Sequence, residues 1–486
     1  MNNNKNQWNS IFTFILAMIG LTIGIGNIWR FSYVLYSNGG GSFFIPYLIA
    51  ILIMGIPFLI LEYGLGFSFK KSFFKLMHDI RPEFEIIAWM LVLFVFIVAI
   101  YYMVILGWDF VYLLNSFNFG WGNDPNSFFL NNVGGSDNLT NAFTLMLPTL
   151  MCTLLLWVFF WFVSMRDVDK GIGRLSTVVI PLLFIIMIII FGYAFTLPGA
   201  NLGIETLLAP NWYSLTDINI WISAFGQTLF TLSIGQAMVY TYASYLPKNS
   251  KLIDEVLLVV VANSLYEIFI ALGVFSILGY MSSSSSIPLD ELISQGTGLI
   301  FVVFPQIFNK MGFFGHIFAP LLFVSILLAG ITSAFALFEP LLSSLCGKLG
   351  WSRRKGVTIL TIVACICTVI FSTGISSYLV EIIDKFVNNF GILILIGIQV
   401  IIFGWFYGVE KVIPYLNEFS TFKVGRTWVF TLKYILPIFL IILWVSGIVK
   451  IFEGSNMFEI AVDIIISLVV VGLSVFLTKL RSSNTN

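Results

Sequence analysis

The 486-residue sequence is poor in histidine, cysteine and charge, and each shortage excludes a class of protein. Its two histidines, His78 and His316, cannot supply a histidine-rich metal site or a His-Glu-x-x-His protease helix. Its four cysteines lie in or beside apolar runs, and their spacing fits neither a zinc site nor a disulfide framework. Charged residues make up only 10% of the chain, against about 25% in soluble domains, so a soluble fold is excluded.

Hydrophobic residues dominate what remains, at 59% of the chain, with a mean hydropathy of +0.98. Lys plus Arg and Asp plus Glu are 24 each, and this zero net charge indicates no nucleic-acid partner. The sequence therefore predicts an all-α polytopic membrane protein whose surroundings are the lipid bilayer. A helix needs about 20 apolar residues to cross the hydrocarbon, and twelve segments meet that need. They are residues 11–36, 42–66, 87–113, 143–164, 175–195, 219–245, 256–281, 316–346, 356–373, 378–406, 428–449 and 457–478.

The basic residues predict how these helices are oriented, because cytoplasmic loops are enriched in Lys and Arg. With the N-terminus inside, nineteen of the 24 basic residues lie in cytoplasmic segments, and only Lys310 and Lys450 lie outside. We therefore expect a multi-pass protein of the cell (plasma) membrane with both termini cytoplasmic, including an N-terminal segment 1–10 and a tail 481–486. The external stretch 288–309 is expected to form one or two short helices.

The first predicted helix carries an unusual polar interruption. Gly20, Gly24 and Gly26 each weaken a helix by about 1 kcal/mol, and Asn27 and Arg30 follow them. A break here would expose backbone groups that lipid cannot satisfy, so it must line a cavity. Close helix packing through small residues is the alternative, but packing does not account for Asn27 and Arg30.

The sixth predicted helix repeats this pattern, with Gln227, Thr231, Ser233, Gly235 and Gln236 inside its apolar run. Paired interrupted helices in two halves of a chain indicate a secondary transporter with its site near the bilayer midplane. The first repeat would cover about 11–195 and the second about 219–406. Together they form a ten-helix core at 11–406, and two accessory helices follow at 407–480.

Several motifs are specific enough to indicate a family. Trp29-Arg30-Phe31, Tyr33, Asn38-Gly39-Gly40-Gly41 and Phe43 resemble the signature of the neurotransmitter:sodium symporters. Gly24-Ile25-Gly26-Asn27 and Thr241-Tyr242-Ala243-Ser244-Tyr245 fit it as well, while Ser32 replaces the usual proline. The resemblance implies a LeuT-like fold with a 5+5 inverted repeat, and sodium-coupled symport of an amino acid by alternating access. Cysteine-free external loops indicate the prokaryotic type. No enzyme activity and no organic cofactor are implied.

The resemblance also implies two Na⁺ sites built from neutral oxygens, which suit a hard, weakly held cation. The first site would use Thr22, Asn27, Thr231 and Asn263, and the substrate carboxylate would complete it. The second would use Gly20, Ile23, Ala329, Thr332 and Ser333. Taken alone, the Thr332 and Ser333 hydroxyls would be read as bonding back to their own helix.

The substrate pocket implied by the resemblance lies between the two breaks. Its residues would be Gly24, Ile25, Gly26, Val98, Tyr102, Phe230, Thr231, Ser233, Gln236, Ser333 and Leu337. Tyr102 would donate to the substrate carboxylate and Phe230 would cover the ligand from outside. Monoamine carriers of the family place an aspartate where Gly24 stands, so this sequence resembles an amino-acid carrier. Gln236 either recognises a polar substrate side chain or bonds backbone freed in the break.

Glu267 follows Asn263 by one helical turn. In chloride-dependent members the matching region binds the anion, with Tyr47, Gln227, Thr231 and Asn263 around it. A carboxylate at Glu267 resembles the chloride-independent members, in which fixed negative charge replaces the anion. The alternative is a neutral, hydrogen-bonded structural acid.

Two gates are implied as well. Arg30 and Asp384 match an outer, water-bridged ion pair, although Lys385 adjoins Asp384 and offers another partner. Lys5, Trp8 and Tyr245 match the inner gate, but its acid would fall at Gly347. Glu62 is expected to bond backbone freed in the breaks, with Gln399 as its companion. A non-transporting sensor or an ion channel on the same scaffold remains the alternative function, and a homodimer stays open.

Overall fold

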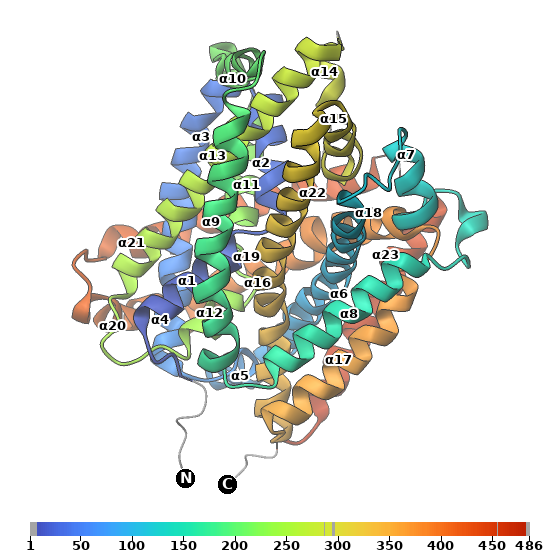
Figure 1. Cartoon of the computed structure of the whole chain (residues 1–486). Coiled ribbons are helices and arrows are strands. Elements are labelled where there is room, and N and C mark those ends of the chain that lie inside the picture. The colour runs from blue at the N-terminus through green and yellow to red at the C-terminus, as the bar shows by residue number, and fades with distance from the viewer. Residues whose placement is uncertain (1–6, 286, 294–296, 454, 483–486) are drawn as a thin grey trace.

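The computed structural model describes residues 7–285, 287–293, 297–453 and 455–482, which form a bundle of helices (Figure 1). The first half contains α1 (Ile11–Thr22), α2 (Gly26–Ser37), α3 (Phe44–Ala50), α4 (Ile56–Phe69), α5 (Phe73–Ile80), α6 (Glu85–Ser116), α7 (Pro125–Phe128), α8 (Leu147–Ser164), α9 (Arg174–Ala194) and α10 (Ala200–Leu208). The second half contains α11 (Ile218–Thr231), α12 (Met238–Ala243), α13 (Leu252–Ser285), α14 (Leu289–Leu292), α15 (Phe304–Lys310), α16 (Gly315–Leu349), α17 (Arg353–Ile370), α18 (Ser376–Phe386) and α19 (Leu393–Ile401). The last part adds α20 (Ile413–Phe419), α21 (Arg426–Phe430), α22 (Leu436–Phe452) and α23 (Met457–Lys479).

All twelve predicted ranges contain helix. By length and composition, nine of the described helices can cross a membrane, and α1 with α2 makes a tenth, bent by 64°. The remaining two predicted ranges are the interrupted pair α11 and α12 and the helix α17, which opens with Arg353-Arg354-Lys355. The short external helices expected at 288–309 are present as α14 and α15.

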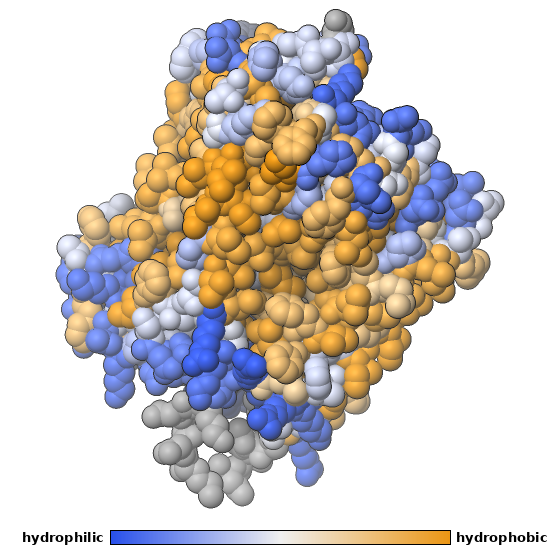
Figure 2. Space-filling view, in the orientation of Figure 1, coloured by the Kyte–Doolittle hydropathy of each residue, from blue (hydrophilic) through white to orange (hydrophobic). Residues whose placement is uncertain are grey.

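The surface and the centre of the bundle differ as a membrane protein requires. Hydrophobic side chains form a broad band across the middle of one face, and hydrophilic ones gather toward its two ends (Figure 2). The most apolar stretch of α6 is 83% buried and that of α23 only 17%. The long helices α6 and α16 pack against each other at the centre, while α23 lies at the edge.

The two polar interruptions produce the predicted breaks. Between α1 and α2 the chain becomes extended at Ile23. Between α11 and α12, three residues take left-handed backbone conformations, with φ of 52° at Ser233, 72° at Gly235 and 61° at Ala237. Such conformations are costly outside glycine and need support from their surroundings.

Buried polar side chains support the second break. The Gly235 amide donates to Glu62 Oε2 at 3.1 Å, and Gln399 Nε2 donates to the Gly235 carbonyl at 2.9 Å. Both partners are almost completely buried, at 3% and 1% exposure. These contacts confirm the expected pairing of Glu62 and Gln399 with freed backbone. The amide and the carbonyl of Gly235, which the break removes from helical bonding, are thereby satisfied, as an environment without water demands.

Candidate substrate and ion site

The two breaks face one cavity inside the bundle. It has a volume of about 120 Å³, several times the roughly 15 Å³ that one water molecule needs. All eleven residues expected to bind substrate line it, from Gly24 on the first break to Leu337 on α16. The cavity wall also contains residues that the sequence analysis did not predict for the substrate pocket, namely Tyr101, Ile105, Met238, Asp384 and Asn388.

The cavity is narrow around Gly24. The Tyr102 hydroxyl accepts a hydrogen bond from the Ile25 amide at 3.3 Å. A Cβ atom on Gly24 would lie 3.1 Å from that hydroxyl and 3.2 Å from Ser333 Oγ. Glycine therefore keeps open the space between the Tyr102 hydroxyl and the backbone that starts α2. That backbone is a helix N-terminus, whose partial positive charge favours an anionic group.

Five oxygens expected at the second Na⁺ site lie together below the first break. Thr332 Oγ1 lies 3.0 Å from the Gly20 carbonyl and 2.8 Å from the Ala329 carbonyl. Ser333 Oγ lies 3.0 Å from the Gly20 carbonyl and 3.2 Å from the Ile23 carbonyl. The hydroxyls thus reach across to α1 as well as back along α16. This set of neutral oxygens suits a hard, weakly held monovalent cation.

The residues expected at the first Na⁺ site form a connected cluster around Asn27. Its Oδ1 accepts from the Gly24 amide at 2.7 Å. Its Nδ2 lies 3.3 Å from Thr231 Oγ1 and 3.1 Å from Asn263 Oδ1. Asn263 Nδ2 in turn donates to Thr231 Oγ1 at 2.9 Å. Thr22, Asn27 and Thr231 also line the substrate cavity, so this cluster and the cavity share a wall.

Glu267 is completely buried beside this cluster. Its Oε1 accepts from Thr231 Oγ1 at 2.5 Å, from Asn27 Nδ2 at 3.1 Å and from Gln227 Nε2 at 3.3 Å. Its Oε2 accepts from the Tyr47 hydroxyl at 2.7 Å. A carboxylate accepts hydrogen bonds only, and the Asn27 and Gln227 amides can only donate here. The site therefore has the donors that a buried anion requires.

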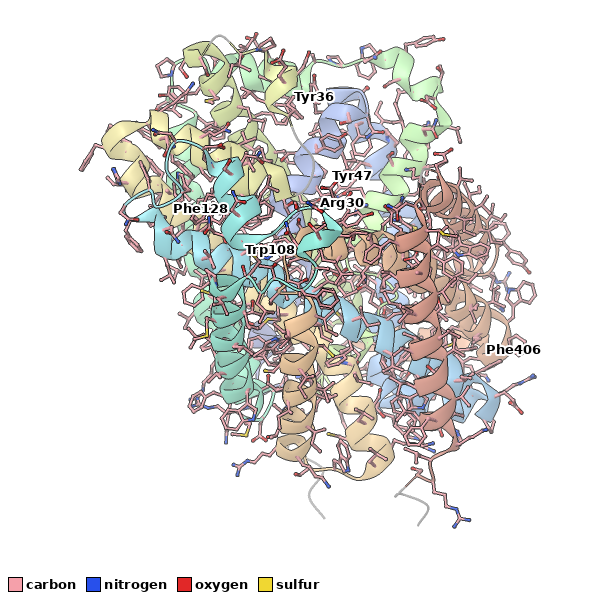
Figure 3. All side chains as sticks on the ribbon, turned by 90° about the vertical axis from the view of Figure 1, so that its right-hand side faces the viewer. Arg30, Tyr36, Tyr47, Trp108, Phe128 and Phe406 are labelled. Carbon is pink, nitrogen blue, oxygen red and sulfur yellow. The ribbon has the colours of Figure 1, made fainter. Side chains whose placement is uncertain are left out.

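Of the two outer-gate residues, Asp384 lines the substrate cavity and Arg30 lies in the upper half of the bundle (Figure 3). The Arg30 guanidinium stacks over the Phe230 ring, 4.1 Å from its centre. Asp384 Oδ1 accepts from the Tyr101 hydroxyl at 2.7 Å and from Asn388 Nδ2 at 2.8 Å. Among the described residues Asp384 forms no direct ion pair with Arg30 or Lys385. Both Arg30 and Asp384 face one outer cavity of about 300 Å³.

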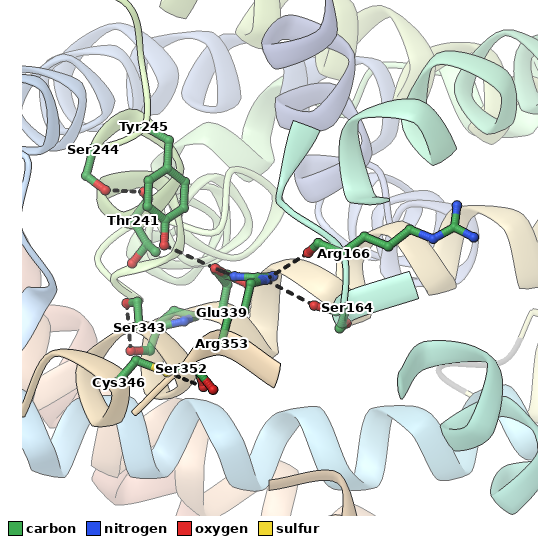
Figure 4. A network of polar contacts seen from close by, with 11 residues as sticks. Ser164, Arg166, Thr241, Ser244, Tyr245, Glu339, Ser343, Cys346, Ser352 and Arg353 are labelled. Carbon is green, nitrogen blue, oxygen red and sulfur yellow. Dashed lines mark hydrogen bonds and ion pairs between the residues drawn. The ribbon is translucent and has the colours of Figure 1, made fainter. Parts of the chain in front are cut away.

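Hydrogen bonds connect the expected inner-gate residues Trp8 and Tyr245, while Lys5 lies outside the described residues. The Trp8 amide donates to the Tyr245 carbonyl at 3.0 Å, and its indole Nε1 donates to the Tyr242 carbonyl at 2.9 Å. The Tyr245 hydroxyl donates to Glu339 Oε1 at 3.1 Å (Figure 4). Arg353 binds both oxygens of Glu339, at 2.5 and 2.9 Å. Glu339 on α16 is therefore an acid beside the expected inner-gate residue Tyr245, eight residues before Gly347, where the resemblance placed the acid.

Several helical acids escaped the sequence analysis, and the two most deeply buried of them are Glu339 and Asp109. Glu339 is 1% exposed and stands directly before Pro340, inside an apolar run. The sequence signal for an ion pair with Glu339 was the run of three basic residues at the start of α17, the first of which is Arg353. Asp109 on α6 is fully buried, and neither of its carboxylate oxygens has a hydrogen-bond partner among the described residues. Its only sequence signal is a charge within an apolar run.

Comparison with known proteins gives a consistent picture. The sequence profile of the sodium:neurotransmitter symporter family matches residues 5–135 and 123–475. An uncharacterized sodium-dependent transporter of Methanocaldococcus jannaschii is 36% identical over 437 residues, covering 90% of this chain and 89% of that protein. The sodium-dependent serotonin transporter of Drosophila melanogaster is 26% identical over 478 residues, covering 91% and 76%. The crystal structure of MhsT in complex with L-phenylalanine superposes with a TM-score of 0.76 at 28% identity, covering 91% of this chain and 99% of MhsT.

Broken helices around one central cavity, in a bundle with an apolar outer band, define a secondary transporter of the membrane rather than an enzyme. The family profile and the related sequences identify which family of secondary transporters this is. The chain belongs to the sodium:neurotransmitter symporter family, with the fold of MhsT. It is therefore a sodium-coupled transporter of a small molecule, and the family predicted from its motifs is confirmed.

Proposed function

We propose that this protein couples the inward movement of Na⁺ to the uptake of an amino acid across the plasma membrane by alternating access. The observation that carries the proposal is the single cavity at which both broken helices meet. Residues of the expected first Na⁺ site form part of its wall. A substrate bound there touches the same backbone segment as the ion, so each stabilises the binding of the other.

The chemistry around Gly24 favours an amino acid over an amine. The α2 N-terminus and the Tyr102 hydroxyl offer hydrogen-bond donors to a carboxylate. Asp384 lines the cavity but already accepts from Tyr101 and Asn388. The complex of MhsT with L-phenylalanine supports the same substrate class. Gln236 lines both this cavity and the outer one, so it favours a substrate side chain with a hydrogen-bonding group.

Two Na⁺ ions are proposed, one at the Asn27 cluster and one between α1 and α16. The second site spans helices from different repeats, because Gly20 and Ile23 belong to the first break and Ala329, Thr332 and Ser333 to α16. An ion there ties the inner half of the first helix to α16. Its release would loosen α1, which also carries the inner closure through nearby Trp8.

Chloride independence is proposed from Glu267. Its carboxylate occupies the position where Tyr47, Gln227 and Thr231 converge as hydrogen-bond donors. A fixed negative charge beside the first cation site supplies the balance that a chloride ion would otherwise provide. The chain then needs no external anion for uptake.

The direct test is a thermal-stability screen of the purified protein against the twenty amino acids, each with Na⁺ or with choline. A ligand at about 100 times its Kd stabilises the folded state by about 2.7 kcal/mol. We expect one chemically related group of amino acids to raise Tm in Na⁺ and not in choline. Equal shifts in both salts would refute sodium coupling of binding. No shift with any amino acid would refute the substrate class.

A further inference from the structure

A groove runs between α8 and α17 on the outer surface of the bundle. The two helices pack side by side along their length (Figure 1). The groove has a volume of about 520 Å³ and is lined by Val158 and Trp161 of α8 and by a stripe of α17 residues from Thr358 to Val369. Around it, Ile362 and Ile366 are 55% and 65% exposed. Exposed aliphatic side chains in the middle of a spanning helix face lipid, so this groove opens to the bilayer.

The length of the groove matches one leaflet of a bilayer. From Thr358 to Val369 the helix rises by about 16 Å, at about 1.5 Å per residue. Half of a hydrocarbon core of about 30 Å is about 15 Å. The groove begins near the end of α17 that is predicted to be cytoplasmic. It therefore has the position and reach to hold one acyl chain of the cytoplasmic leaflet.

Positive charge lies at the cytoplasmic end of the groove. Residues three and four apart lie on one helix face, so Arg354 and Lys355 continue the stripe that contains Thr358. The Thr358 hydroxyl donates to the Arg354 carbonyl at 2.9 Å, which places Arg354 one turn below it. Both basic residues are exposed, and neither forms an ion pair with a described acid. Figure 2 shows hydrophilic residues at the lower end of this hydrophobic surface.

The third basic residue of this run has a different partner. Arg353 is engaged with both oxygens of Glu339, so its charge is balanced within the chain. Lys355 lies 5.1 Å from the centre of the Trp351 ring, and Arg166 lies 4.8 Å from that of Phe162. Aromatic rings position these cations without neutralising them. Three cations at this end of the two helices therefore have no anionic partner among the described residues.

The placement of these charges is unfavourable for the helix itself. The N-terminus of a helix carries partial positive charge, and basic residues are disfavoured there. Arg354 and Lys355 both stand in the first turn of α17, where an acid would be expected. An external anion at this point would be attracted by both side chains and by the helix terminus.

We propose that the groove is a binding site for an anionic phospholipid of the cytoplasmic leaflet. Its acyl chain lies along the stripe from Thr358 to Val369, and its phosphate is held by Arg354 and Lys355 with Arg166 close by. The site is distinct from the substrate cavity. It lies beside the inner closure, because Arg353 Nε donates to the carbonyls of Ser164 and Arg166 at 3.0 and 3.1 Å (Figure 4).

The test uses full-length protein from vesicles of equal palmitoyl-oleoyl phosphatidylglycerol and palmitoyl-oleoyl phosphatidylcholine. Native mass spectrometry then measures which lipid is retained after mild delipidation. We expect preferential retention of phosphatidylglycerol, reduced about tenfold in the variant Arg354→Gln/Lys355→Gln. The matched control is Lys423→Gln/Arg426→Gln, which removes two exposed cations elsewhere on the predicted cytoplasmic side and should retain the lipid as the wild type does.

A second readout locates the bound chain. Phosphatidylglycerol with a photoreactive acyl chain should crosslink within 358–369, where Cys365 lines the groove. Crosslinks spread evenly over the lipid-facing helices would overturn the proposal, as would equal retention of phosphatidylglycerol by the wild type and the double variant. Dimers that carry no phosphatidylglycerol in the native mass spectra, with no lipid adduct on α17, would overturn it too, because a second copy of the chain would then occupy the groove.

Discussion

At the scale of single residues, the site depends on a few side chains that would be too costly to bury without partners. Glu267 has hydrogen-bond donors at both oxygens, and Asn27 links the Gly24 backbone to that carboxylate. The sequence was sufficient to name these residues, because their motifs are ordered along the chain. It was not sufficient to place their rotamers. Asp384 was expected to form a water-bridged pair with Arg30; it shares the outer cavity with Arg30, and its bonds to Tyr101 and Asn388 were not foreseen.

The variant Glu267→Ser tests the proposed role of this carboxylate. Removing it leaves Tyr47, Gln227 and Thr231 as unpaired donors around a small space. Chloride is the available anion for such donors, so uptake by the variant should become dependent on chloride while wild-type uptake stays independent. Radiolabelled uptake in chloride and in gluconate measures this. A variant equally active in both salts would contradict the role.

The variant Gly24→Ala tests the substrate cavity. The added methyl group would crowd the Tyr102 hydroxyl and Ser333 Oγ, so we expect substrate affinity to fall at least about tenfold, equivalent to about 1.4 kcal/mol. Isothermal titration in Na⁺ measures it. Gly226→Ala is the matched control, because its Cβ would meet nothing within 4 Å. Similar losses in both variants would show that the effect is general destabilisation.

At the scale of elements, the breaks in the first and sixth helices were predictable because glycine and buried polar residues occur together. The side chains that bond the freed backbone of the second break, Glu62 and Gln399, were also predictable from the sequence. The position of Glu339 beside Tyr245 was not predictable. Gly350 has a φ of 63° and reverses the chain after α16, so the start of α17 returns beside the last turns of α16. That return brings Arg353 to Glu339, two turns before the position expected from the sequence.

The pair of Arg353 and Glu339 should hold the inner side closed. Removing one member of a buried pair costs about 3–5 kcal/mol, so Arg353→Gln should favour opening toward the predicted cytoplasmic side. A cysteine introduced at buried Thr241, in a Cys346→Ser background, reports the opening by its alkylation rate. We expect at least about a tenfold increase. Arg354→Gln, which removes an exposed neighbouring charge, should leave the rate unchanged. Equal rates in all three backgrounds would contradict the role.

At the scale of the whole molecule, composition alone identified a membrane protein, and the distribution of basic residues predicts its orientation. The described chain begins and ends on the same side of the bundle (Figure 1), as an even number of crossings requires. Hydropathy could not locate all twelve helices equally well. The pair α11 and α12 is interrupted and contains polar residues that line the substrate cavity. Helix α17 begins with three basic residues, which lower its mean hydropathy.

Sodium-driven accumulation of an amino acid is the central claim, and one measurement tests it most directly. Purified protein is reconstituted in vesicles, and entry of the labelled amino acid selected by the stability screen is followed under defined ion gradients. We predict accumulation above the external concentration only with an inward Na⁺ gradient, and collapse of that accumulation when Na⁺ is equalised. Binding without accumulation, as in a sensor, or ion current without substrate, as in a channel, would contradict the claim.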